Sequence, residues 1–118
     1  MSKLLIVDDE IDVMEFAKNF FKKRNIDVQT ASNGIEALEI INHEKPDLVL
    51  LDIIMDEMNG LEVLKTLRAE KNSVKVIMVT GREDEDTVKE TESLGITGYI
   101  HKPLILDELE KVVLRELQ

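Results

Sequence analysis

Five short runs rich in apolar residues alternate with five longer segments, and this order narrows the choice of fold to one class. The runs are Leu4–Val7, Ile26–Ala31, Leu48–Leu51, Val74–Val79 and Gly98–Ile100. Each has the length of a strand, and the segments after them have the spacing or the length of helices. Such an alternation predicts an α/β fold with a parallel sheet, because parallel strands need long crossover connections, which are usually helices.

The segments between the runs carry helix signals. Apolar residues recur every three or four positions from Ile11 to Phe21, from Ala37 to Ile41, from Leu61 to Leu67 and from Leu106 to Leu117. Asn33 and Asn59 each precede a glycine and have a glutamate three residues later, which is typical of helix N-caps. Residues 83–94 are acidic and have few apolar side chains, so we predict a weak helix there.

These elements predict a five-stranded parallel sheet in the order 2-1-3-4-5, doubly wound by helices. Right-handed crossovers then put the first and last helices on one face and the second, third and fourth on the other. We expect residues 1–118 to form one domain, because this length suits a single hydrophobic core.

The charge of the chain excludes several classes of function. It has 25 Asp and Glu against 15 Lys and Arg, a net charge of −10, which opposes binding to nucleic acid or to an anionic membrane. No apolar run approaches the ~20 residues of a membrane span. The N-terminus turns acidic too soon for a signal peptide. We therefore expect a cytoplasmic domain that binds neither nucleic acid nor membrane.

Chemically active side chains follow the predicted strands at their ends. Asp8 and Asp9 follow the first strand, Asp52 the third, Thr80 the fourth and Lys102 the fifth. Ligands bind open parallel sheets beyond the carboxyl ends of the strands, where the strand order reverses, so these side chains should converge. Carboxylates this close need a neutralising cation, and an all-oxygen cluster suits Mg²⁺. With a hydroxyl and an ammonium, the cluster predicts phosphoryl transfer, in which a carboxylate can be the nucleophile.

Four motifs stand at these strand ends. They are Ile6-Val7-Asp8-Asp9-Glu10, Leu50-Leu51-Asp52 followed by Met55 and Asn59-Gly60, Val79-Thr80, and Tyr99-Ile100-His101-Lys102-Pro103. With them the whole chain resembles the response-regulator receiver domains of two-component signalling. The resemblance implies a phosphoacceptor signalling domain and not an enzyme that turns over an external substrate.

The resemblance also implies how the site would work. Asp52 would accept a phosphoryl group from a sensor histidine kinase or a phosphotransfer protein, in a reaction that depends on Mg²⁺. Asp9, Asp52 and the backbone carbonyl of Ile54 would bind the metal directly, and Asp8 would contribute through water. Lys102 would bind phosphoryl oxygens, placed by a cis peptide bond to Pro103.

A conformational switch is implied as well. Thr80 would bind phosphoryl oxygens together with Lys102, and Tyr99 would rotate into the space that Thr80 vacates. The signal would emerge on the surface formed by residues 83–94, by the fifth strand and by the last helix. An output domain or effector protein would bind there, whether the chain stands alone or is part of a longer protein.

Other functions compete with this interpretation. A haloacid-dehalogenase-like phosphohydrolase also uses Asp and Mg²⁺, but it has a second Asp two residues after the nucleophile, where Asp8 is followed by Glu10. A flavodoxin-like cofactor binder favours Gly, Ser and Thr after the first strand. A receiver-like interaction module that has lost phosphorylation is the third alternative. Asp56 stands where the family usually has Pro, which leaves metal affinity and kinase recognition open.

Overall fold

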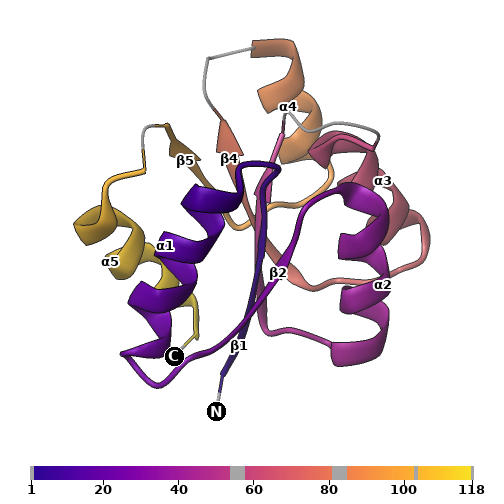
Figure 1. The fold of residues 1–118 in the computed structure, drawn as a ribbon. Coiled ribbons are helices and arrows are strands. Elements are labelled where there is room, and N and C mark those ends of the chain that lie inside the picture. The colour runs from indigo at the N-terminus through magenta and orange to yellow at the C-terminus, as the bar shows by residue number, and fades with distance from the viewer. Residues whose placement is uncertain (1, 54–57, 81–84, 103, 118) are drawn as a thin grey trace.

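The computed structural model describes residues 2–53, 58–80, 85–102 and 104–117, and it contains the predicted alternation of strands and helices (Figure 1). The elements are β1 (Lys3–Val7), α1 (Ile11–Lys22), β2 (Asp27–Ala31), α2 (Gly34–Glu44), β3 (Leu48–Asp52), α3 (Gly60–Ala69), β4 (Lys75–Thr80), α4 (Glu85–Ser93), β5 (Gly98–His101) and α5 (Leu106–Leu117). The predicted α/β class is confirmed.

All strand pairs of the sheet are parallel, in the order β2-β1-β3-β4-β5, which confirms the predicted order 2-1-3-4-5. The order reverses at β1, because β2 pairs on one side of it and β3 on the other. Residues of β1 and β3 are almost all buried, as expected for central strands that helices cover on both faces.

The sheet separates two apolar cores. In Figure 1, α1 and α5 lie on one side of the sheet, and α2 and α3 on the other. Met14 and Phe21 of α1 pack with Leu109 and Val113 of α5 in the first core. The second core joins residues of α2 and α3 to the opposite sides of the same strands. This arrangement confirms the predicted assignment of helices 1 and 5 to one face.

Both predicted N-caps are present. The Asn33 side chain accepts a hydrogen bond from the backbone N–H of Glu36 at 2.9 Å. Asn59 and Glu62 form a reciprocal capping box at the start of α3. Each strand differs from its predicted run by one residue at one or both ends; at β5, His101 belongs to the strand. Its pairing with Thr80 extends the ladder by one residue.

Helix α3 begins directly against the end of β3. The Gly60 N–H donates to the carbonyl oxygen of Ile53 at 2.9 Å. A Cβ atom at Gly60 would lie 2.2 Å from the backbone carbonyl oxygen of Asp52, which is too close for two atoms that are not bonded. Only glycine allows this close approach without moving backbone atoms. Gly60 therefore sets the distance between α3 and the carboxyl end of β3.

We expect Gly60→Ala to lower the free energy of unfolding by about 1–3 kcal/mol, because the added methyl group collides with backbone and not with a flexible side chain. Gly98→Ala in β5 is the matched control, since a Cβ there has no atom within 4 Å. Gly98→Ala should leave stability unchanged or raise it slightly. Urea denaturation of both variants measures the difference, and equal stabilities would contradict the close contact.

Candidate functional site

The carboxyl ends of four strands bring the predicted site residues to one edge of the sheet. Asp52 is the last residue of β3 and pairs with Val79, so it lies next to Thr80 at the end of β4. The backbone N–H of Lys102 donates to the carbonyl oxygen of Thr80 at 2.8 Å, which extends β5 along β4. Asp8 follows β1 directly, and its N–H donates to the Ala31 carbonyl oxygen. The strand pairing thus holds these backbones in register before any side chain interacts.

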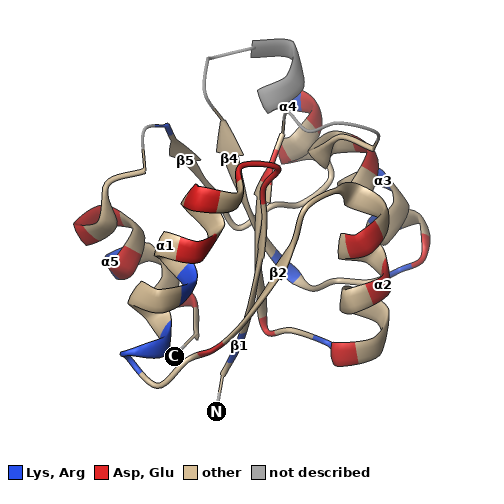
Figure 2. Ribbon diagram, viewed as in Figure 1, with Lys and Arg blue, Asp and Glu red and all other residues tan. Residues whose placement is uncertain are grey.

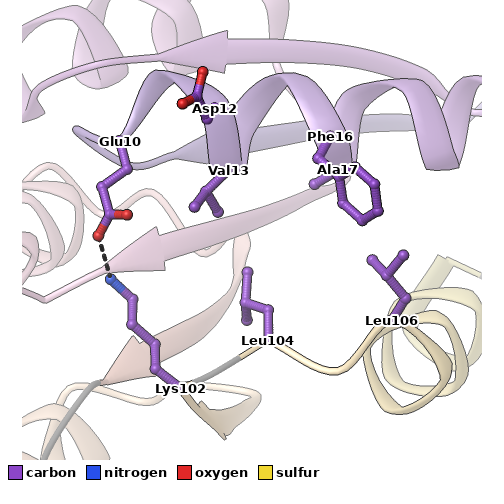
Figure 3. Close-up of a pocket in the computed structure, with 8 residues that line it drawn as sticks. All are labelled: Glu10, Asp12, Val13, Phe16, Ala17, Lys102, Leu104 and Leu106. Carbon is purple, nitrogen blue, oxygen red and sulfur yellow. Dashed lines mark ion pairs between the residues drawn. The ribbon is translucent and has the colours of Figure 1, made fainter.

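The Lys102 ammonium lies among three carboxylates. Its Nζ is 2.8 Å from Oδ2 of Asp52. It is 3.9 Å from Oδ2 of Asp8 and 3.9 Å from Oε1 of Glu10, the contact drawn in Figure 3. Burial lowers the pKa of Lys102, but the hydrogen bond to Asp52 and the three negative charges outweigh it and raise the pKa above its ordinary value. Lys102 therefore stays protonated and compensates the carboxylates.

Asp8 is buried, with 3% of its surface exposed. Its Oδ1 accepts a hydrogen bond from the Glu10 N–H at 2.9 Å. Burial raises the pKa of Asp8 to about 6; the backbone hydrogen bond and Lys102 oppose the rise, whereas Asp52 and Glu10 add to it. The ionised form of Asp8 is thus costly in the metal-free protein, which a bound cation would relieve.

Asp8, Asp9 and Glu10 form an acidic cluster after β1, the stretch drawn red at the end of that strand in Figure 2. One carboxylate oxygen from each lies within 4.8 Å of the others. Oxygen donors of this kind fit Mg²⁺, which takes few carboxylates and keeps several waters. Asp8 and Asp9 belong to the predicted ligand set, whereas Glu10 does not. The Lys102 ammonium connects Asp52 to the cluster, because it contacts Asp52, Asp8 and Glu10. Ile54 lies outside the described residues.

The two predicted switch residues lie close to this edge. Thr80 is buried, with 4% of its surface exposed. Tyr99 is half-buried on β5, and its hydroxyl is hydrogen-bonded to the hydroxyl of Thr91 in α4. The sequence prediction gave Thr91 no role. The spacing of Val88, Thr91 and Leu94 along one helical face was the available signal, but the acidic residues around Thr91 obscured it.

A groove of about 750 Å³ runs beside the site, between α1 and the segment before α5. Its walls carry apolar side chains, and Glu10 and Lys102 stand at one end (Figure 3). The residues that line it are Glu10, Asp12, Val13, Phe16, Ala17, Lys102, Leu104 and Leu106. Phe16 lies on the surface of α1, with 64% of the residue exposed.

Comparison with known proteins identifies the family. The family model for the response regulator receiver domain matches residues 4–114. The chain belongs to the response-regulator receiver family. This result confirms the resemblance that the four motifs predicted, and it sets the receiver interpretation above the hydrolase and cofactor-binding alternatives.

Relatives of this receiver domain occur both alone and within longer proteins. The chain is 35% identical to the sporulation initiation phosphotransferase F of Bacillus subtilis over 98% of the chain and 93% of that protein. It is 36% identical to the regulatory protein AtoC of Escherichia coli, but spans only 26% of it. Among solved structures, chemotaxis protein CheY4 of Vibrio cholerae aligns with a TM-score of 0.91, 28% identity and 99% coverage of both chains. Within the described residues of the receiver domain, no helix is long and apolar enough to cross a membrane.

The buried Asp8 makes the stability of the metal-free receiver domain depend on pH. Its pKa in the folded state, about 6, exceeds its ordinary value of 3.8, so the folded state binds the proton more tightly than the unfolded state. Asp8 therefore lowers stability as pH rises through 4 to 6, and the full cost is present above that window.

In the presence of a chelator, we expect Asp8→Asn to raise the free energy of unfolding at pH 7.5 by about 1–2 kcal/mol, and the gain to fade as pH falls to 4. Asp12→Asn is the control, because Asp12 is exposed in the first turn of α1, where a negative charge is favourable. It should not raise stability. Denaturation midpoints measured across this pH range test the prediction, and a gain that grows toward pH 4 would contradict it.

Proposed function

We propose that this receiver domain accepts a phosphoryl group on Asp52 from a phosphohistidine of a sensor kinase or phosphotransfer protein. The observation that carries the proposal is the buried Asp52 carboxylate, which is held 2.8 Å from the Lys102 ammonium beside Asp8, at the reversal point of the sheet. Receiver domains are signalling domains, and phosphoryl transfer to this residue is the activity that the site chemistry supports best.

In the proposed step, a carboxylate oxygen of Asp52 forms a bond to phosphorus as the bond from phosphorus to the donor's imidazole nitrogen breaks. The imidazole leaves with the electron pair of that bond and takes up a proton from water. Lys102 moves from the carboxylate toward the phosphoryl oxygens, so that its positive charge stabilises the negative charge that develops on them. Thr80 donates a hydrogen bond from its hydroxyl to the same group of oxygens.

The step as proposed depends on Mg²⁺. Asp9 and Asp52 would hold the ion directly, Asp8 would hold it through water, and Glu10 stands within the same cluster. The predicted fourth contact, the carbonyl of Ile54, lies outside the described residues. A bound Mg²⁺ supplies positive charge that offsets the carboxylates and the phosphoryl oxygens. The donor chemistry of the acidic cluster supports this assignment.

We further propose that phosphorylation draws Thr80 inward and that Tyr99 follows. The surface formed by α4, β5 and α5 would then change its conformation and its affinity for an output domain or effector protein. Two features support this surface: Tyr99 lies on β5, and the sequence of α4, EDTVKETES, offers few apolar anchors. The change is a population shift between two arrangements and needs no new fold.

We also propose a domain extent, partners and a location for the protein. Residues 1–118 would form one receiver domain that turns over no external substrate. The net charge of −10 supports a role without direct nucleic acid binding. An output domain in the same chain and a separate effector protein both fit the proposal, since relatives of both lengths exist. The cytoplasmic location stays a prediction.

Incubation with acetyl phosphate and Mg²⁺ should add one phosphoryl group to the protein, because a small phosphodonor can replace the kinase when the site itself provides the chemistry. Asp52→Asn should abolish the adduct. Asp47→Asn is the matched control, since Asp47 precedes the same strand at its other end and binds the Lys3 backbone N–H. Intact-mass spectrometry measures the outcome. An adduct retained in Asp52→Asn, or none in the native protein, would overturn the proposed function.

Millimolar Mg²⁺ should raise the melting temperature, because a ligand that binds only the folded state stabilises it by mass action. The rise should grow with the logarithm of the Mg²⁺ concentration once the site is filled. Asp9→Asn should abolish most of the rise, and Asp12→Asn should keep it. Calorimetry at several Mg²⁺ concentrations checks this expectation, and an equal rise in Asp9→Asn would remove Asp9 from the site.

A further inference from the structure

Helix α4 buries one polar side chain that the proposed phosphorylation does not use. Among the described residues, the buried polar or charged side chains are Asp8, Asp52, Thr80 and Thr91. The first three belong to the site at the strand ends. Thr91 has no exposed surface, although its neighbours Glu90 and Glu92 are exposed. A buried hydroxyl in so polar a helix needs a specific partner.

That partner is Tyr99. The hydroxyl groups of the two residues are hydrogen-bonded to each other, which joins α4 to β5. Tyr99 packs at the border of the core under α2 and α3, and it pairs with Met78 in the sheet. Two residues later on β5, His101 pairs with Thr80. The phenol of Tyr99 therefore connects α4 to the strand that runs beside Thr80.

The other described contacts fasten α4 elsewhere. Arg68 of α3 donates from Nε to the carbonyl oxygen of Leu94 and from Nη2 to that of Gly95, both at 2.8 Å, just beyond the end of α4. Lys65 and Glu90 form an ion pair at 2.7 Å, but both side chains are exposed, and such pairs stabilise weakly. The segment just beyond α4 is thus tied to α3, whereas the last turn of α4 is tied to β5 through the buried Thr91.

We propose that Thr91 is a positioning residue that holds Tyr99 in the orientation of the unphosphorylated protein. This inference rests on the proposed function, because it concerns the restraint that phosphorylation of Asp52 must overcome. Tyr99 can turn toward Thr80 only when its hydrogen bond to Thr91 opens. The bond therefore stabilises the inactive arrangement, and Thr91 sets how readily the switch turns. A neutral hydrogen bond of ordinary net strength changes such an equilibrium about two- to tenfold.

Thr91→Val removes the hydroxyl at nearly constant volume. Beryllofluoride with Mg²⁺ is a stable mimic of the phosphoryl group, and we expect it to bind Thr91→Val about two- to tenfold more tightly than the native protein. Thr91→Ser keeps the hydroxyl and should bind like the native protein. Thr66→Val is the matched control, since Thr66 donates its hydroxyl to the Glu62 carbonyl oxygen within α3. It should also leave the affinity unchanged. Isothermal titration calorimetry measures all four proteins.

The decisive arm uses Tyr99→Phe, which removes the other hydroxyl. In that background Thr91→Val should no longer change the affinity, because the bond is already absent. A purely structural role for Thr91 would instead give the same effect in both backgrounds. Tyr99 is the only tyrosine, and the chain has no tryptophan, so intrinsic fluorescence reports on this side chain alone. Without any ligand, Thr91→Val should alter that emission, and Thr66→Val should not.

The outcomes separate this inference from the proposed function. If the native protein neither binds beryllofluoride nor forms the acetyl phosphate adduct, the proposed function fails and the inference fails with it. If the native protein does both but Thr91→Val binds with unchanged or lower affinity, only the inference is overturned. An equal gain from Thr91→Val in the Tyr99→Phe background overturns it too. A gain confined to proteins that contain the Tyr99 hydroxyl supports it.

Discussion

The ammonium group of Lys102 compensates the negative charge at the strand ends. Asp52 ends β3, Asp8 directly follows the adjacent strand β1, and both are almost fully buried, so their charges repel each other where water screens poorly. Lys102 contacts both, and it also reaches Glu10. Without a cation there, two buried carboxylates would have to take up a proton or move apart. Burial raises the pKa of Asp8 even though the charge of Lys102 opposes the rise.

The rest of the fold holds these charged residues in place at the edge of the sheet. Apolar side chains on both faces of β1 and β3 bury the sheet, and the parallel ladder aligns the strand ends. Gly60 lets α3 begin against the backbone of Asp52, and the capping box of Asn59 and Glu62 fixes that first turn. The charged residues thus sit at the edge of a rigid frame, and the parts proposed to move, Tyr99 and α4, lie at one side of it.

Tyr99 links helix α4 to β5, the strand that pairs with β4 beside the proposed phosphoacceptor site. Two kinds of contact hold α4: Arg68 binds carbonyl oxygens just beyond its end, and Thr91 in its last turn is hydrogen-bonded to Tyr99. A helix with this sequence gains little from apolar burial, so single polar contacts carry a large share of its placement. These few polar contacts are consistent with the proposal that phosphorylation of Asp52 moves α4 without loosening the rest of the domain.

The amino-acid pattern was sufficient for the elements and the strand order, whereas the roles of the residues at the strand ends stay a prediction. Runs such as Leu48–Leu51 can be buried on both faces only as central strands, and the Asn caps mark helix starts through local hydrogen bonds. The pairing of Thr91 with Tyr99 and the contact of Glu10 with Lys102 were not predictable in this way. Each depends on how far apart two segments lie and on the side-chain conformations there. Periodicity in the sequence indicates which face of an element is buried, because burial repeats along the chain. The contact between Glu10 and Lys102 joins residues 92 positions apart. Such a contact exists only once the sheet has brought the ends of their strands together.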